Sequence, residues 1–379
     1  MSKKIFTSLG LMSGTSMDGV DVSLIKSDGI NEFEVLLNEF YEFDHILYQE
    51  LIELRDKLFT VNDLTKNQEK IKKIERNFTL FNGKLINDIL RKKPIKLDLI
   101  GFHGQTILHL PNEKISKQIG DGNLLSQLTK IKVVNQFRQN DLNHNGQGAP
   151  LAPIFHYLVS KGLNLKFMFN FPISIINIGG ITNVSQIKDG KDENKDIFAY
   201  DIAPGNCLID EWVRKNSNNK IDIDGNFAAQ GKVNDLYLNQ AIENFEIKNV
   251  TNSLDIKNFD ISFARGLNLE DGCATITKYT SYLISEGLKK IDQVNNLNTK
   301  NLFICGGGRK NKVLINEISK ILADKFKFKP IDEYGINGDF VESQAFAFLA
   351  VRSFKKLPIS FPSTTNCKSP CTGGEIIDN

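Results

Sequence analysis

The chain opens with two apolar segments that are separated by a polar turn. Residues 5–12 are mostly apolar, and residues 20–25 alternate between apolar and polar side chains. A period of two residues is typical of a β-strand with one buried face. We therefore predict a strand, a turn at 13–19 and a second strand, followed by a third strand at about 34–43.

Helical periodicity follows this region. In residues 64–91, apolar side chains such as Ile71, Ile74 and Phe78 recur every three to four positions, and this spacing places them on one face of a helix. We predict helices at 45–58 and 64–91, and after them a buried strand at 97–102.

The opening pattern recurs near the middle of the chain. An apolar strand at 174–178 breaks at glycine-rich residues 179–183 and resumes at 184–187. Two strand–turn–strand units, roughly half a chain apart, predict a duplicated architecture. The other predicted elements are strands at 197–200 and 301–305 and helices at 206–214, 274–288, 311–326 and 341–354.

Strands that alternate with helices predict an α/β fold. The chain has 379 residues, which is too long for one ordinary domain, so we expect two. We predict domain I at 1–170 together with a returning helix at 341–356. Domain II is predicted at 171–340, and residues 357–379 are expected to form an irregular tail.

Composition excludes several classes of partner. The chain has 47 basic and 45 acidic side chains and a formal net charge of +2, so we expect neither a nucleic-acid nor a membrane-surface partner. No apolar run approaches the ~20 residues of a membrane span. Thr7 and Ser8 interrupt the apolar residues behind the N-terminal lysines, so no signal peptide is expected.

The cysteines favour a reducing compartment. There are five, an odd number, and Cys207, Cys273 and Cys305 each stand alone, which fits the cytoplasm. Cys367 and Cys371 could form half of a metal site. No second pair of Cys or His lies near them in the sequence, so a zinc site is not expected in the tail.

The turn at 14–19 carries candidate chemistry. It gathers backbone N–H groups and hydroxyls at one point, as phosphate oxygens require, and Asp18 could hold Mg²⁺ through water. It is not a Walker A loop, because it lacks Gly-Lys-Ser/Thr and a strand follows it. An ordinary hairpin turn explains the same residues equally well.

Two further glycine-rich turns lie in the second half of the chain. Residues 177–183 form a turn like the first, and Gly306-Gly307-Gly308 follows a predicted strand. Glycines there would let the backbone lie close against an adenosine. A plain strand-to-helix connection is the more frequent reason for such a turn.

The ordered set of motifs resembles the anhydro-N-acetylmuramic acid kinases of the actin/hexokinase/Hsp70 superfamily. The series opens with the signature at 10–21 and covers nearly the whole chain in family order. The later motifs are Gly101–His109, Gln118–Gly122, Phe137–Asp141, Gly146–Leu151, Asn177–Asn183, Asp201–Asn206, Gly306–Arg309 and Glu342–Ala345.

The resemblance implies a duplicated actin-like (ribonuclease H-like) fold with ATP in the interdomain cleft, and it suggests a homodimer. It implies that ATP and water open 1,6-anhydro-N-acetylmuramic acid and that O6 is phosphorylated, giving N-acetylmuramic acid 6-phosphate in peptidoglycan recycling. The alternatives are an actin-like kinase of another sugar and a non-enzymatic actin-like ATPase module or sugar-responsive regulator. Neither explains Gly104-Gln105-Thr106 together with Gly146–Pro150.

The resemblance places the water-activating base at Asp201. Water that attacks an anomeric carbon needs a base, usually a carboxylate, and we expect Asp201 to close a strand. A role as a helix cap is the alternative. The commonest family form has Thr-Gly after the Asp, where this chain has Ile202-Ala203, and Ala203 would be strained if that position needs a positive φ.

The remaining candidates bind sugar or metal. Arg138 suits the lactyl carboxylate of muramic acid or a surface ion pair. Glu342 could assist Mg²⁺, or it could be an acid in the first turn of a helix that the helix dipole stabilises. The predicted nucleotide residues are Gly14, Thr15, Ser16, Met17, Asp18, Gly19, Val20, Asp21, Gly179, Gly180, Thr182, Asn183, Gly306, Gly307 and Gly308. The predicted sugar residues are His103, Gln105, Thr106, Arg138, Pro204, Gly205 and Asn206, and those for Mg²⁺ are Asp18 and Glu342.

Overall fold

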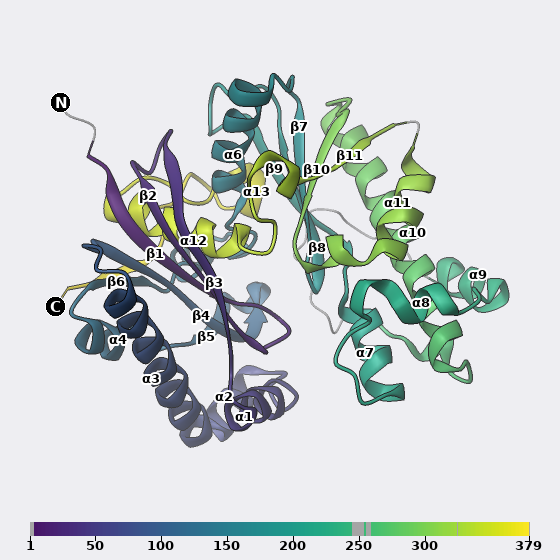
Figure 1. Ribbon diagram of the computed structural model, residues 1–379, viewed down its shortest axis with the longest axis horizontal. Helices are drawn as coiled ribbons and strands as arrows, with labels where there is room; N and C mark the ends of the chain where they lie inside the picture. The colour runs from purple at the N-terminus through teal and green to yellow at the C-terminus, as the bar shows by residue number, and fades with distance from the viewer. Residues whose placement is uncertain (1–3, 245–253, 255–258, 324, 379) are drawn as a thin grey trace. The chain divides into compact units, whose positions relative to one another are not determined.

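The computed structural model describes residues 4–244, 254, 259–323 and 325–378, and the chain divides into two units (Figure 1). Unit 1 comprises Met1–Leu158 and Phe340–Asn379, and unit 2 comprises Val159–Asp339. The first division lies inside helix α6, Pro153–Phe167, upstream of position 170.

The sheet of unit 1 is built around an antiparallel meander of its first three strands. The strand order is β12-β6-β4-β1-β2-β3, with β5 paired to β4. Strand β4 runs parallel to β1, and β6 runs parallel to β4. The bounds are β1 Phe6–Ser13, β2 Gly19–Ser27, β3 Phe33–Glu42, β4 Leu99–Leu110, β5 Ile115–Ile119, β6 Lys132–Asn135 and β12 Glu375–Ile377.

The sheet of unit 2 repeats this plan. Its order is β11-β10-β7-β8-β9, in which β7, β8 and β9 form the antiparallel meander. Strand β10 runs parallel to β7, and β11 runs parallel to β10. The bounds are β7 Ile173–Ile178, β8 Ile181–Ile187, β9 Ile197–Pro204, β10 Asn301–Cys305 and β11 Lys327–Pro330. The shared order confirms the predicted duplicated α/β fold.

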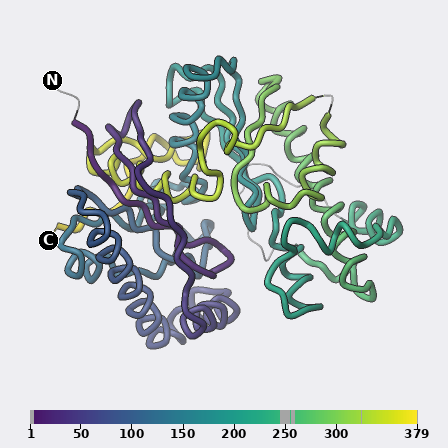
Figure 2. Tube along the Cα trace, in the orientation of Figure 1, coloured from purple at the N-terminus to yellow at the C-terminus, as the bar shows by residue number. Residues whose placement is uncertain are grey.

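Helices cover both faces of the sheet in unit 1. Helix α3 buries Ile71, Ile74 and Phe78 against one face, as its periodicity predicts. Helix α12, Val341–Phe354, lies directly on β1 and β4, because a Cβ on Gly10 would stand 2.0 Å from Ser343 O. Figure 2 traces this C-terminal helix beside the N-terminal strands. The other helices are α1 His45–Arg55, α2 Val61–Lys66, α3 Gln68–Lys92, α4 Gly122–Thr129, α5 Gln139–Asn143, α13 Pro362–Thr365 and the turn η1 Pro111–Glu113.

The core of unit 2 forms around one long helix, α10. A Cβ on Gly272 of this helix would lie 2.2 Å from the indole ring of Trp212 on α7. The two helices therefore pack closely. The helices are α7 Cys207–Asn216, α8 Asn226–Gln230, α9 Asp235–Glu243, α10 Leu269–Asn295 and α11 Lys312–Leu322, with 3₁₀ turns η2 Ile223–Gly225, η4 Ser262–Ala264, η5 Gly307–Lys310 and η6 Ile331–Tyr334.

Two strands extend further than predicted. Strand β4 continues past residue 102 because β5 pairs with its second half, with Gln105 opposite Ile119. Strand β9 continues past residue 200 because β8 pairs with it as far as Pro204. Asp201 therefore lies within a strand rather than at its end.

Other predictions needed correction as well. The helix predicted at 64–91 is two helices, since Asn67 is both the C-cap of α2 and the N-cap of α3. The tail is not irregular throughout, because it forms α13 and the strand β12, which pairs with β6. Among the described residues, no helix is both long and apolar enough to cross a membrane.

Candidate active site

Met17 stabilises the turn between β1 and β2. Met17 adopts a left-handed φ of 56°, its side chain is 2% exposed, and its N–H donates to Gly14 O at 3.2 Å. Its buried side chain leaves only its backbone to face a ligand. The neighbouring Thr15 and Ser16 are exposed, so the turn presents hydroxyls and backbone, as phosphate binding requires.

The residues on the far side of this turn differ in exposure. Asp18 is half-buried, and its Oδ1 accepts a hydrogen bond from the Ser16 hydroxyl at 2.5 Å. Gly19, Val20 and Asp21 already belong to β2, where Asp21 stands opposite Met12. Only Asp18 of these four lies in the turn itself.

Gln105 braces this turn from strand β4. Its Oε1 accepts a hydrogen bond from Ser13 Oγ at 2.6 Å, and its Nε2 donates to Gly14 O at 3.1 Å. The side chain is almost fully buried. Gln105 therefore fixes the start of the turn, a role that the sequence did not reveal. Thr106 follows it and accepts a hydrogen bond from Gln118 Nε2 at 3.0 Å.

His103 and Arg138 form a pair in unit 1. Two guanidinium nitrogens, Nε and Nη2, lie 3.1 and 3.0 Å from His103 Nε2, and Nδ1 lies 2.8 Å from Gly104 O. A guanidinium only donates, so Nε2 is the acceptor and the proton sits on Nδ1. Burial, and then the charge of Arg138, hold the His103 pKa well below its usual range. His103 is therefore neutral.

Arg138 is half-buried and fixed on its other side as well. Its Nη1 donates to Gly148 O at 2.7 Å. Glu342, in the first turn of α12, lies near enough for the two charges to interact. Burial raises the pKa of Glu342, and Arg138 opposes that shift. Unit 1 thus brings together Arg138, His103 and Glu342 among the predicted residues.

Two predicted turns meet in unit 2. Gly205 N donates to Gly180 O at 2.8 Å, and Asn206 N donates to Gly179 O at 2.8 Å. Thr182 Oγ1 adds a bond to Pro204 O at 3.2 Å. The glycine turn after β7 and the turn after β9 therefore form one rigid structure.

Asp201 lies beside this structure at a β-bulge. It stands opposite Asn183, whereas Ala203 stands opposite Thr182, so Ile202 is an extra residue in β9. Asp201 is half-buried, and its Oδ2 accepts a hydrogen bond from Leu254 N at 2.9 Å. A bulge re-aims neighbouring side chains and is frequent beside active sites.

The unusual pair Ile202-Ala203 is accommodated without strain. Ala203 does not have a positive φ and is buried in strand β9, so the strain considered from the sequence does not arise. Ile202 is also buried. Gly287 on α10 makes room for it, since a Cβ on Gly287 would lie 2.8 Å from Ile202 Cβ.

The Gly306-Gly307-Gly308 turn lies at the same edge of the sheet. Parallel strands β7 and β10 pair Asn177 with Cys305, so both strands end here, as ligand-binding edges of α/β sheets do. Gly306 has a φ of 82°, and its Cβ position lies 2.2 Å from Asn177 Oδ1. Gly307 faces Asn206, whose Nδ2 lies 3.9 Å from its Cβ position.

Sequence reasoning missed the residues that hold this turn. Arg309 donates to both carboxylate oxygens of Asp332 at 2.7 and 2.8 Å and to Asp339 Oδ1 at 2.6 Å. It also donates to Gly306 O at 3.0 Å. The acids are more than twenty positions away in the chain, so only the fold could reveal them.

Three glycines in these turns are not required by the fold. Gly14 has nothing within 4 Å of its Cβ position, and Gly179 and Gly307 have only contacts of 3.5 and 3.9 Å. None of the three has a positive φ. By contrast, Gly205 and Gly308 have protein atoms at 2.2 Å from theirs. The open space at the first three is where a ligand could approach the backbone.

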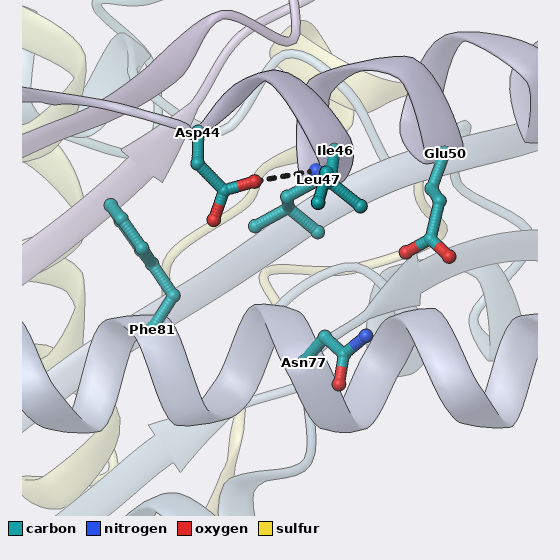
Figure 3. A pocket seen from close by; sticks show the side chains of 6 residues that line it. All are labelled: Asp44, Ile46, Leu47, Glu50, Asn77 and Phe81. Atoms are coloured by element: carbon teal, nitrogen blue, oxygen red, sulfur yellow. Dashed lines mark hydrogen bonds between the residues drawn. The ribbon is translucent and has the colours of Figure 1, made fainter.

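Two pockets lie away from the predicted site residues. Figure 3 shows a pocket of about 150 Å³ in unit 1, where Asp44 Oδ1 caps helix α1 by accepting from Leu47 N. A second, of about 330 Å³, lies in unit 2 between helices α8, α10 and α11. It has apolar walls and a Lys278–Glu317 ion pair at its lining.

The family model and the sequence relatives agree on one family. The family model for anhydro-N-acetylmuramic acid kinase matches residues 6–379. The anhydro-N-acetylmuramic acid kinase of Pelagibacter ubique is 47% identical over the full length of both chains, and that of Brucella canis is 36% identical over 97% of each. A ROK family glucokinase from Streptomyces griseus, solved with glucose and AMPPNP, aligns with 91% of this chain and 99% of its own at 11% identity and a TM-score of 0.40.

Proposed function

Because the chain belongs to the anhydro-N-acetylmuramic acid kinase family, we propose that its glycine turns bind ATP and that Asp201 activates water at the sugar. The chain is a phosphotransferase with an alcohol group as acceptor. Its substrate is 1,6-anhydro-N-acetylmuramic acid, and its product, N-acetylmuramic acid 6-phosphate, enters peptidoglycan recycling.

The observation that carries the ATP sites is the set of glycines Gly14, Gly179 and Gly307. Each could carry a side chain without a clash, so the fold alone does not explain them. Backbone N–H groups in such turns bind phosphate oxygens when no side chain intervenes. Thr15 and Ser16 add exposed hydroxyls to the first turn, whereas the buried Thr182 supports the second turn through its bond to Pro204 O.

Asp201 has the chemistry of a general base. Its carboxylate accepts a proton from water, whose oxygen attacks C1 of the sugar while the bond from C1 to O6 breaks. O6 receives the γ-phosphoryl group of ATP, so its negative charge needs no separate acid. The hydrogen bond from Leu254 N to Oδ2 and the adjoining bulge at Ile202 support a fixed orientation of this carboxylate.

Arg138 is proposed to bind the lactyl carboxylate of the sugar. His103 and Gly148 O orient the guanidinium through hydrogen bonds, and Glu342 is the acid close enough to interact with its charge. Arginine suits this role because its donors match the two carboxylate oxygens. Pro204, Gly205 and Asn206 are proposed to face the sugar from unit 2.

Mg²⁺ is proposed to act with ATP. The groups at Asp18 suit this ion, because a half-exposed carboxylate and the Ser16 hydroxyl lie together at the turn. Mg²⁺ prefers such oxygen ligands and keeps several waters. Glu342 is proposed as a second acid. When bound, the ion offsets the charge of the phosphate oxygens.

The location and assembly are also proposals. A cytoplasmic location is supported by the five cysteines, all of them free thiols, since that compartment keeps thiols reduced. The homodimer that the resemblance suggests stays a prediction.

A product assay tests the function directly. Purified chain, Mg²⁺ and ATP should convert 1,6-anhydro-N-acetylmuramic acid into N-acetylmuramic acid 6-phosphate, detected by mass spectrometry. In ¹⁸O-labelled water, early samples should carry the label at C1 and none in the phosphate. Phosphorylation of glucose or of ordinary N-acetylmuramic acid at an equal rate would favour an actin-like kinase of another sugar.

A further inference from the structure

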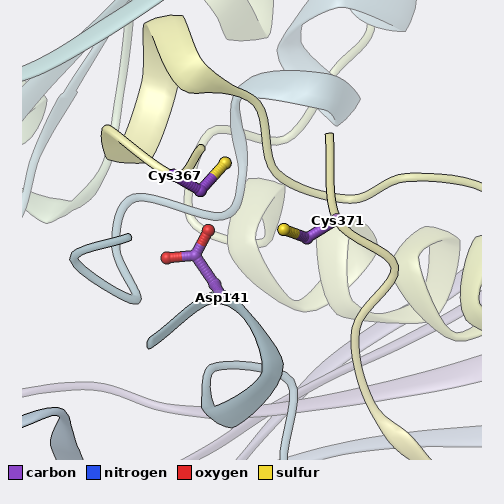
Figure 4. A group of neighbouring side chains, drawn as sticks. All are labelled: Asp141, Cys367 and Cys371. Atoms are coloured by element: carbon purple, nitrogen blue, oxygen red, sulfur yellow. The ribbon is translucent and has the colours of Figure 1, made fainter. Parts of the chain in front are cut away.

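Two cysteines of the C-terminal segment meet a buried carboxylate from helix α5. The ligand atoms of Asp141, Cys367 and Cys371 all lie within 4.8 Å of one another, and Figure 4 shows Asp141 on its helix beside the two cysteines of the C-terminal segment. All three are at most 3% exposed. The proposed reaction uses none of them.

The two sulfurs converge on one carbonyl. Cys367 Sγ and Cys371 Sγ lie 3.2 and 3.0 Å from Ser369 O. Backbone pairing fixes Cys371 as well, because Cys371 N donates to Ser360 O at 3.0 Å and Ile359 N donates to Cys371 O at 2.7 Å. The thiols are therefore preorganised next to each other.

Asp141 is held as rigidly as the thiols. Its Oδ2 accepts a hydrogen bond from Gly148 N and its Oδ1 accepts one from the Thr365 hydroxyl, both at 2.6 Å. A Cβ on Gly146 would stand 2.1 Å from Oδ2, so the loop leaves no room for the carboxylate to turn away. Oriented carboxylates of this kind are good metal ligands.

A fourth polar group faces the cluster. Ser360 Oγ is fully buried and, apart from the two sulfurs, has no hydrogen-bond partner among the described residues. Burial raises the pKa of both thiols, and the Ser360 hydroxyl, within reach of each, opposes that shift. Sulfur is a weak hydrogen-bond acceptor, so a buried hydroxyl with only two sulfurs in reach is poorly satisfied.

We propose that Asp141, Cys367 and Cys371 bind one zinc ion, with Ser360 beside the fourth position. Two thiolates select a borderline-soft cation over Mg²⁺ or Ca²⁺. With Zn–S bonds of about 2.3 Å, tetrahedral sulfurs stand roughly 3.8 Å apart, so separations up to 4.8 Å need shifts of about 1 Å or less. Binding releases one proton from each thiol.

The ion would act as a clip for the C-terminal segment. Asp141 already holds Gly148 N, and Gly148 O accepts from Arg138. Gln147 N donates to Thr365 O at 2.7 Å. Zinc would therefore join the segment at 367–371 to the loop that positions the proposed carboxylate-binding arginine. Asp141 could not be predicted as the third ligand, because it lies more than 200 residues from the cysteines in the chain.

Metal binding to the full chain tests the proposal. Protein stripped with a chelator and kept reduced should take up one Zn²⁺ per chain by elemental analysis. With Co²⁺ as the probe, it should show the near-ultraviolet thiolate charge-transfer band. Cys367→Ser/Cys371→Ser should lose the band, and Cys371→Ser alone should weaken Zn²⁺ binding at least ~100-fold. Ser360→Ala should weaken it about 10-fold.

Cys273→Ala is the matched control, since it removes a buried thiol of unit 2 and should keep both stoichiometry and band. X-ray absorption of the zinc-loaded wild type needs no variant to fold and should show two sulfurs at about 2.3 Å. Less than stoichiometric Zn²⁺, a band that survives in the double variant, or a zinc shell of oxygen and nitrogen alone would each overturn the site.

Discussion

Gln105 lies in the middle of strand β4, and its Oε1 accepts a hydrogen bond from Ser13 Oγ at 2.6 Å. Ser13 is the residue directly before the phosphate-type turn. The same amide donates to Gly14 O. A residue expected to bind sugar therefore supports the backbone of the proposed nucleotide turn. Its effect on catalysis should pass through ATP.

Gln105→Leu should raise the KM for ATP about 10-fold while changing the KM for sugar little. The substitution leaves the buried Ser13 hydroxyl with only Gly19 O as a partner, which costs about 1–3 kcal/mol of stability. Steady-state kinetics and thermal unfolding measure both effects. Thr106→Val, at the next residue, is the control. If Gln105→Leu raised the KM for sugar more than the KM for ATP, the proposed support of the nucleotide turn by Gln105 would be wrong.

Gly14→Val should leave the fold intact and weaken ATP binding. Nothing lies within 4 Å of its Cβ position, so Tm should stay within a few degrees, whereas a side chain would hold phosphate away from the backbone. Gly19→Val is the contrasting variant, because its Cβ would lie 2.4 Å from the Phe40 ring. Calorimetric titration with a non-hydrolysable ATP analogue should separate the two; intact ATP affinity in Gly14→Val contradicts the proposal.

Asp201→Asn should lower kcat by ~10²–10⁴, the usual cost of losing a general base, and keep ATP affinity. The amide can still accept the bond from Leu254 N, so the local structure should persist. Asp189→Asn, a change at a half-buried acid of the same unit that has no proposed role, should keep full activity. A kcat near that of the wild type in Asp201→Asn would remove Asp201 from the base role.

Acid should destabilise the chain between pH about 6.5 and about 4. Burial lowers the pKa of His156 to about 4, below the ordinary value of about 6.5. In this window the unfolded chain binds more protons, so stability is lost as pH falls. The loss is at most roughly 3 kcal/mol for this histidine. His156→Gln should flatten the pH profile of the unfolding free energy, and exposed His45→Gln should not; parallel profiles for both variants would refute the assignment.

Gly287→Ala should destabilise the chain by about 1–3 kcal/mol, as overpacking does, because the new methyl would meet Ile202 at 2.8 Å. Gly162→Ala is the matched control in helix α6, where nothing lies within 4 Å, and it should stabilise by about 0.5–1 kcal/mol. Chemical denaturation measures both. An equal increase in the free energy of unfolding in the two variants would mean that Ile202 can pack against an alanine at position 287.

Local patterns predicted the elements that depend on local signals. Strand β10 and helix α12 have their predicted bounds of 301–305 and 341–354, because apolar runs and flanking glycines mark them. Pairing across the sheet was not predictable in the same way. Strand β4 continues through polar His103 and Gln105 only because β5 offers it a partner.

The candidate site also has a part that local sequence predicts and a part that only the fold reveals. Its turns could be found from glycine and hydroxyl composition, which is local chemistry. The groups that orient them come from distant segments: Asp332 and Asp339 for Arg309, and Leu254 for Asp201. A backbone amide such as that of Leu254 has no sequence signature at all, since every residue but proline has one.

The contact of Gly10 with helix α12 has a consequence for synthesis. Strand β1 is made long before the helix that covers it, which belongs to residues 341–354, so one face of the first sheet stays bare until that helix has left the ribosome. Unit 2 is continuous from Val159 to Asp339, and domains fold as units in the order of their emergence. The middle of the protein can therefore mature before its beginning, and a nascent chain that stalls before residue 341 exposes a face of the first sheet that helix α12 covers in the folded protein.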